Sequence, residues 1–126
     1  MNFSNFGTGK PKSSIMIINK KTEGNIVILS LEGRLDTLNF SLLEKEMNLL
    51  IENNQKNIIL DCQGLDYVSS SGLRILLKSL KQVEAVKGRF TICNLQPQIA
   101  QIFKISGFDR LFELYPGSRE AVASYL

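Results

Sequence analysis

The chain has 126 residues, of which 44% are hydrophobic and 21% are charged, and its 15 Lys and Arg against 12 Asp and Glu give a net charge of +3. A chain of this length and composition buries the core of one domain, which excludes disorder of the whole chain and argues against a second domain. The sequence contains no His, the most common general base and metal ligand, so several enzyme classes lose their key residue.

The N-terminal third of the chain predicts a tail, two strands and a helix. Residues 1–14 are rich in Ser, Gly, Asn and Lys and are expected to form a flexible tail. Apolar β-branched runs at 15–18 and 26–31 predict two strands, which pair antiparallel because only the polar turn at 19–25 connects them. Helical spacing of apolar residues predicts a helix over 39–53, with Asn39 or Ser41 as candidate N-caps and Glu44 completing a candidate capping box after Ser41.

The rest of the chain alternates strands and helices. Short apolar runs at 58–60, 90–93 and 111–114 predict strands, and helical periodicity predicts helices over 73–83, 97–105 and 118–125. Strands joined through helices by short loops form a largely parallel sheet with right-handed crossovers. We therefore expect one α/β domain over residues 15–126, in the order β-β-α-β-α-β-α-β-α. It has a mostly parallel sheet, an antiparallel N-terminal strand and about four helices.

The cysteines, the hydropathy and the charge distribution narrow the class of protein further. Cys62 and Cys93 end apolar runs and are expected to be small buried thiols, with a redox role as the less favoured alternative. No apolar run is long enough to span a membrane and the N-terminus lacks a signal peptide, so we expect a cytoplasmic protein with no membrane partner. The surplus of three positive charges is spread along the chain, which does not indicate direct binding to nucleic acid.

Three loops are expected at the carboxyl ends of the parallel strands, where open α/β sheets bind ligands and partners. They cover residues 32–37, 64–72 and 94–97, and the second ends in the serines 69–71 immediately before a helix. One of these serines is expected to cap the helix, and the others place hydroxyls where a phosphate is electrostatically favoured. The simpler alternative is that all three are a cap and its solvated neighbours.

The absence of two motifs argues against two kinds of enzyme activity, and the roles of a basic row and of Asp36 stay open. The chain has neither a Gly-x-Ser-x-Gly elbow nor a glycine-rich phosphate loop, which argues against hydrolase and kinase activity. Arg74, Lys78 and Lys81 fall on one face of the expected helix and form either a surface for an acidic partner or a solvated helix face. Asp36, near Arg34, could start a helix, lie beside a phosphate site or contact a partner.

Taken together, two segments resemble the signatures of STAS domains, in particular those of bacterial anti-sigma factor antagonists. They are Leu31-Glu32-Gly33-Arg34-Leu35-Asp36 and Tyr67-Val68-Ser69-Ser70-Ser71-Gly72-Leu73, each followed by a helix. The resemblance extends from residue 15 to the C-terminus and includes residues 102–108, which resemble the helix of this family that ends in Gly before the last strand. The family motif reads Asp-Ser-Ser/Thr-Gly, so Ser70 and Ser71 occupy its hydroxyl positions and Ser69 replaces its Asp.

The resemblance implies a regulator that is not an enzyme and holds no cofactor or metal. In its unphosphorylated state such a protein binds an anti-sigma factor that is also a serine/threonine kinase, and so releases a sigma factor. Phosphorylation, here expected on Ser71 or Ser70, ends this binding, and a metal-dependent serine/threonine phosphatase resets the switch. The expected partner surface consists of Asp36, Thr37, Ser69, Ser70, Ser71, Gly72, Arg74 and Lys78.

Two other functions fit the same residues less well. The domain could be a constitutive scaffold subunit of a transporter or signalling complex, in which case the serines would only cap the helix. It could also be a small-molecule sensor or a minor enzyme with a pocket at the carboxyl ends of the strands, which the absence of His and of a phosphate loop disfavours.

Overall fold

A computed structural model describes residues 15–126 of the chain, so the expected tail over 1–14 lies outside the described residues. The strands are β1 (Met16–Glu23), β2 (Ile26–Leu35), β3 (Asn57–Val68), β4 (Arg89–Cys93) and β5 (Glu113–Tyr115). They form one sheet in this order, with β1 antiparallel to β2 and every later pair parallel. The expected α/β fold and strand directions are therefore confirmed.

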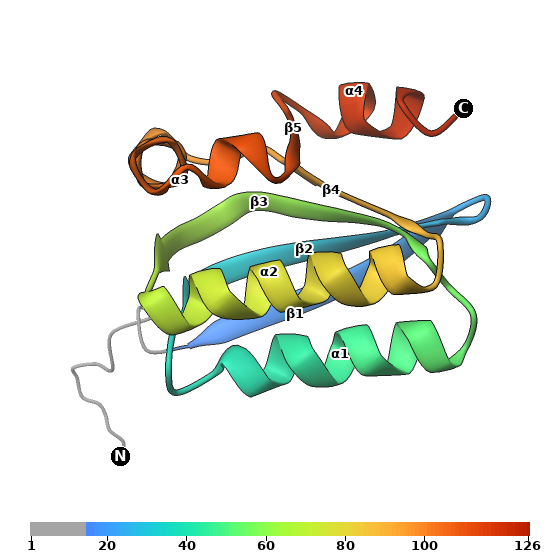
Figure 1. Cartoon of the computed structure of the whole chain (residues 1–126), viewed down its shortest axis with the longest axis horizontal. Coiled ribbons are helices and arrows are strands. Elements are labelled where there is room, and N and C mark those ends of the chain that lie inside the picture. The colour runs from blue at the N-terminus through green and yellow to red at the C-terminus, as the bar shows by residue number, and fades with distance from the viewer. Residues whose placement is uncertain (1–14) are drawn as a thin grey trace, which may run out of the picture.

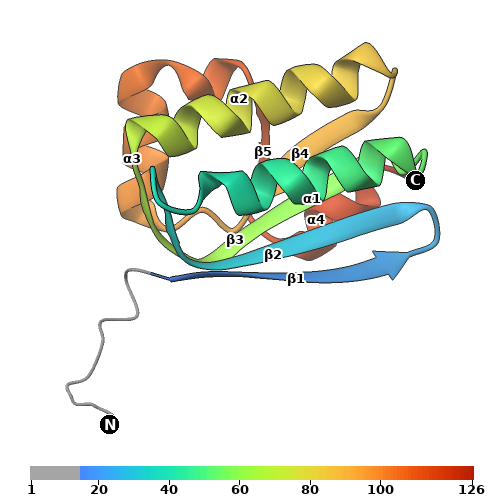
Figure 2. The same ribbon diagram turned by 90° about the horizontal axis from the view of Figure 1, so that it is seen from below.

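Four α-helices complete the domain in the expected order. They are α1 (Phe40–Glu52), α2 (Ser70–Ala85), α3 (Pro97–Ser106) and α4 (Ser118–Ala123), with a short 3-10 helix, η2 (Phe108–Arg110), after α3. Figure 1 shows α1 and α2 side by side over one face of the sheet, and Figure 2 shows α4 on the other face. The helices α1 and α2 therefore form one continuous outer layer, and both begin at the same end of the sheet.

Alternation along the strands produces two hydrophobic clusters, because successive side chains point to opposite faces of a sheet. On β2, Val27, Leu29 and Leu31 face the layer of α1 and α2 and belong to the larger cluster. Ile26 and Ile28 face the other way and pack with residues of α4 in the smaller cluster. Cys62 lies in the larger cluster and Cys93 in the smaller one; both are buried and free, as expected.

The strands are longer than their apolar runs. Residues 19–23, expected in a turn, continue β1 as an exposed edge, and the turn is reduced to Gly24 and Asn25, with Gly24 at φ +60°. Most of the expected loops at 32–37 and 64–72 are also strand, because β2 and β3 stay paired as far as Leu35 and Val68 across two irregularities. Polar residues continue these strands because the neighbouring strand satisfies their backbone groups.

Two other local expectations are wrong. The strand expected at 111–114 is displaced to β5, because Gly107 adopts φ +81° and directs the chain into η2 first. The capping box expected between Ser41 and Glu44 does not form: the N-cap residue of α1 is Asn39, one of the two expected candidates, and its side chain makes no capping hydrogen bond. The side chain of Asn39 instead makes hydrogen bonds to the loop that precedes the helix.

Candidate functional site

The first turn of α2 contains the three serines. Ser69 is the N-cap residue, with φ −85° and ψ 175°, and its Oγ accepts a hydrogen bond from the backbone N–H of Gly72 at 3.1 Å. The expectation that one serine caps this helix is therefore confirmed. Ser70 is exposed and Ser71 half-buried, and their hydroxyls lie at the positive end of the helix dipole.

Gly72 brings the start of α2 close to the end of β2. It is buried, and a Cβ placed on it would lie 2.5 Å from the carbonyl oxygen of Leu35. The same carbonyl accepts a hydrogen bond from the backbone N–H of Ser69 at 3.0 Å. The helix therefore begins against the backbone of the preceding strand, and this places the serines beside the loop that follows β2.

Internal hydrogen bonds hold that loop, residues 36–39. The Asp36 carboxylate accepts hydrogen bonds from the backbone N–H of Leu38 at 3.0 Å and from Nε of Arg34 at 3.2 Å. Asn39, only 7% exposed, accepts from the backbone N–H of Asp36 at 2.9 Å and donates to the carbonyl of Arg34 at 2.7 Å. Of the roles left open for Asp36, the structure shows one at the start of α1, where its carboxylate orders the loop.

The Arg34 side chain joins this loop to β3. Its guanidinium carbon lies 3.9 Å from the centre of the Tyr67 ring while Nε contacts Asp36, so cation–π stacking and an ion pair act on the same group. Leu38 is left 82% exposed at the tip of the loop. The loop therefore presents an apolar side chain on a well-ordered backbone.

The two loops meet through a pair of hydroxyls. Oγ1 of Thr37 and Oγ of Ser71 lie 3.1 Å apart, and Nη2 of Arg74 lies 3.5 Å from the same Ser71 oxygen. The structure thus brings together Thr37, Ser71 and Arg74 from the expected partner surface. The loop at 94–97 makes its hydrogen bonds elsewhere, because Asn94 donates to Asp61 and Gln96 to the carbonyl of Gln63.

From Ser71 a groove of about 720 Å³ follows α2 on its side toward α1. Its apolar lining includes Phe40, Ile75, Leu77 and Ala85, and its charged lining consists of Arg74, Lys78, Lys81 and Glu44. Lys78 forms an ion pair with Glu44 across the two helices. The basic row therefore borders an apolar groove, an arrangement that the sequence did not predict.

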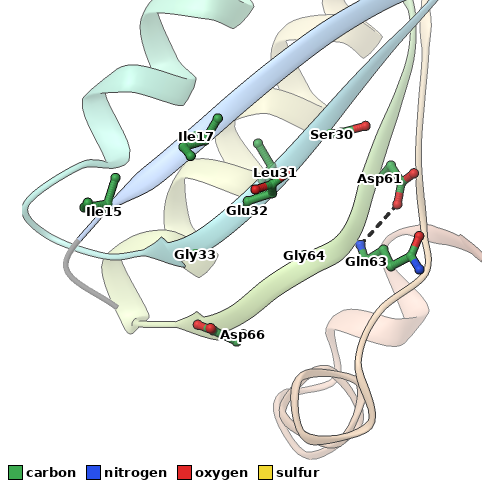
Figure 3. A pocket seen from close by; sticks show the side chains of 10 residues that line it. All are labelled: Ile15, Ile17, Ser30, Leu31, Glu32, Gly33, Asp61, Gln63, Gly64 and Asp66. Atoms are coloured by element: carbon green, nitrogen blue, oxygen red, sulfur yellow. Dashed lines mark hydrogen bonds between the residues drawn. The ribbon is translucent and has the colours of Figure 1, made fainter. Parts of the chain in front are cut away.

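A second cavity, of about 550 Å³, lies at the outer face of β1, β2 and β3 (Figure 3). Ile15 and Ile17 contribute exposed apolar surface, and Glu32, Asp61 and Asp66 make its charged lining acidic. It contains none of the residues expected for partner binding. The pairing of β2 with β3 is irregular at two places, which breaks the regular alternation of side chains between the two faces of the sheet. The sequence pattern therefore did not reveal this cavity.

The cysteines are poorly suited to nucleophilic or redox chemistry. Burial, together with the nearby Asp61, raises the pKa of Cys93 to about 12, and burial raises the pKa of Cys62 as well. Both thiols are therefore protonated at neutral pH.

Within residues 15–126 no three His, Cys, Asp or Glu side chains gather to hold a metal ion. None of the helices in this part of the chain combines the length and the hydropathy that a membrane span requires.

Comparison with known proteins decides the family. The model of the STAS domain family matches residues 18–121. The chain belongs to the STAS domain family. Relatives of this STAS domain include a Bordetella bronchiseptica protein named as the anti-sigma factor antagonist BtrV, which is 36% identical over 99 residues, covering 79% of this chain and 84% of that protein.

Solved structures show the same fold. An anti-sigma factor antagonist from Mycobacterium paratuberculosis superposes with a TM-score of 0.79 at 19% identity, covering 87% of this STAS domain chain and 93% of that one. The Bacillus cell fate determinant SpoIIAA in its phosphorylated form gives a TM-score of 0.69 at 22% identity, covering 87% and 100%. The expected STAS fold is therefore confirmed, as is the likeness of the sequence to anti-sigma factor antagonists.

Proposed function

We propose that this STAS domain protein is an anti-sigma factor antagonist that works by partner switching. Unphosphorylated, it binds an anti-sigma factor that is also a serine/threonine kinase, and a sigma factor is released. Phosphorylation of Ser71, or of the more exposed Ser70, ends the binding. The observation that carries this proposal is the position of the Ser71 hydroxyl, which joins the two loops and borders the groove along α2.

A phosphate at this position is compatible with the fold. It would lie at the N-terminus of α2, where backbone N–H groups and the helix dipole favour an anion, and close to Arg74. It would carry about −1.5 to −2 charges and change the surface that a partner meets. Ser69 caps the helix with a neutral hydroxyl, so no carboxylate stands at the N-cap of α2 before phosphorylation.

The remaining parts of the proposal are the partner surface, the phosphatase and the place where the protein acts. The surface comprises Asp36, Thr37, Gly72 and Lys78 together with the serines and Arg74, and a metal-dependent serine/threonine phosphatase restores the unphosphorylated state. The protein acts in the cytoplasm as a regulator without catalytic activity of its own. The relatives named as anti-sigma factor antagonists support this role.

Quantitative affinity capture from a lysate of the source organism tests the switch. The baits are the wild-type chain and its Ser70→Asp and Ser71→Asp variants. Two matched controls are Ser71→Ala, which removes the hydroxyl without adding charge, and Thr22→Asp, which adds the same charge at an exposed position of β1. Thermal unfolding of every bait checks that the fold is intact.

We expect wild type and both controls to hold an anti-sigma factor with an ATPase kinase domain, and one Asp variant to lose it. The variant that loses the partner identifies the acceptor serine. Equal capture of the kinase by all five baits would refute the phosphorylation switch. Capture of the same transporter or signalling subunits by all five would instead establish the constitutive scaffold.

A further inference from the structure

The groove between α1 and α2 has the features of a docking site for a helix. It follows α2 from Ser71 to Ala85, a distance of about 21 Å at 1.5 Å per residue. Phe40, Ile75 and Leu77 contribute apolar surface to its lining. A partner helix of about four turns would match this length, and its apolar face would cover the lining.

The charges along the groove favour a partner helix that carries negative charge. Arg74, Lys78 and Lys81 contribute three positive charges and Glu44 contributes one negative charge, so 3 − 1 leaves a net charge of +2. Glu44 is already paired with Lys78, and among residues 15–126 Lys81 lies in no ion pair. Carboxylates beside the apolar face of the partner would meet Arg74 and Lys81.

We infer that the groove binds an acidic amphipathic helix of the partner, with Ser71 at its end as the electrostatic control. This inference rests on the proposed function and names the chemistry of the partner segment. A phosphate of about −2 charges on Ser71 would offset the +2 of the groove and attract Arg74 away from the partner. Phosphorylation would thus remove the charge complementarity that holds the helix, without blocking the apolar lining.

A pair of designed peptides of about 16 residues tests this directly. Both have Leu at helical spacing on one face, and the flanking positions are Glu in one peptide and Lys in the other. Binding to the full chain is measured by fluorescence anisotropy, and the contact surface by backbone NMR shifts of the isotope-labelled protein. Matched variants are Ser71→Glu, Arg74→Glu with Lys81→Glu, and Lys21→Glu, an exposed lysine of β1 that does not line the groove.

We expect the Glu peptide to bind at least about tenfold more tightly than the Lys peptide, with shifts at Leu77, Lys81 and Ala85. Ser71→Glu should weaken the Glu peptide, the double charge reversal should invert the preference, and Lys21→Glu should change neither. Binding of the Glu peptide should also weaken as the salt concentration is raised from about 0.05 M to about 0.5 M.

Several outcomes would overturn the inference. They are equal binding of the two peptides, binding of neither, or shifts confined to the outer face of β1 and β2. Self-association of the labelled chain through Leu77 and Ala85, at the expense of peptide binding, would assign the groove to a second copy instead. If the peptides fail while Ser71→Asp still releases the kinase in affinity capture, the helix site is wrong and the switch stands.

Discussion

Substitution of Gly72 by Ala should destabilise the domain even though Ala favours helices. In an exposed helix this change would stabilise by about 1 kcal/mol. Here the new Cβ would lie 2.5 Å from the carbonyl oxygen of Leu35 and 3.0 Å from a side-chain carbon of Val68. Overpacking of this kind costs about 1 to 3 kcal/mol, and the upper end applies because one of the contacts is with backbone.

The upper value of about 3 kcal/mol, less the propensity gain of about 1, leaves a net loss of about 2 kcal/mol. For a domain of this size that corresponds to a fall in Tm of about 8 °C. Thermal and urea unfolding followed by circular dichroism measure it, with Lys81→Ala as the control because this side chain is exposed on the same helix. An unchanged or higher Tm for Gly72→Ala would show that the end of β2 yields without cost and would refute the reasoning.

Three further outcomes are expected. Ser69→Ala should lower the free energy of unfolding by about 1 kcal/mol through loss of the cap, whereas Ser69→Asp keeps an acceptor and should lose nothing in the same urea titration. A hydrogen bond from Arg89 lowers the pKa of Glu113 below its ordinary value of 4.5, so this pair stabilises at neutral pH and the benefit disappears on acidification. Glu113→Gln should therefore lower the Tm at pH 7 and make it less sensitive to pH below 4.5. Cys62 and Cys93 should resist a thiol reagent at pH about 8 until urea unfolds the chain, and fast labelling of either in the folded protein would contradict their burial.

The helices were predictable because each buries one face. The apolar positions of α2, Ile75, Leu76, Leu80 and Val83, recur at helical spacing and are buried. The strand ends were not predictable to the same degree. Residues 19–23 are exposed and polar, and they belong to β1 because β2 pairs with them, a contact that local patterning does not encode.

The candidate site shows the same division. The N-cap role of Ser69 could be anticipated because it depends on residues three positions apart. The contact between Thr37 and Ser71 joins positions 34 residues apart and depends on how closely Gly72 approaches β2. The groove depends on the packing of α1 against α2, so the sequence indicated the basic row but not the apolar lining beside it.

The end of the chain lies on the face of the sheet opposite α1 and α2. The Tyr125 hydroxyl donates a hydrogen bond to the carbonyl oxygen of Ile58 at 2.5 Å, and Leu126 beyond it is 96% exposed. Figure 2 shows this end away from the start of α2. A bead, sensor chip or fluorescent carrier attached through Leu126 is therefore separated from the layer of α1 and α2 by the sheet itself. Immobilised in this way, the protein would present Ser71 and its groove to the solution.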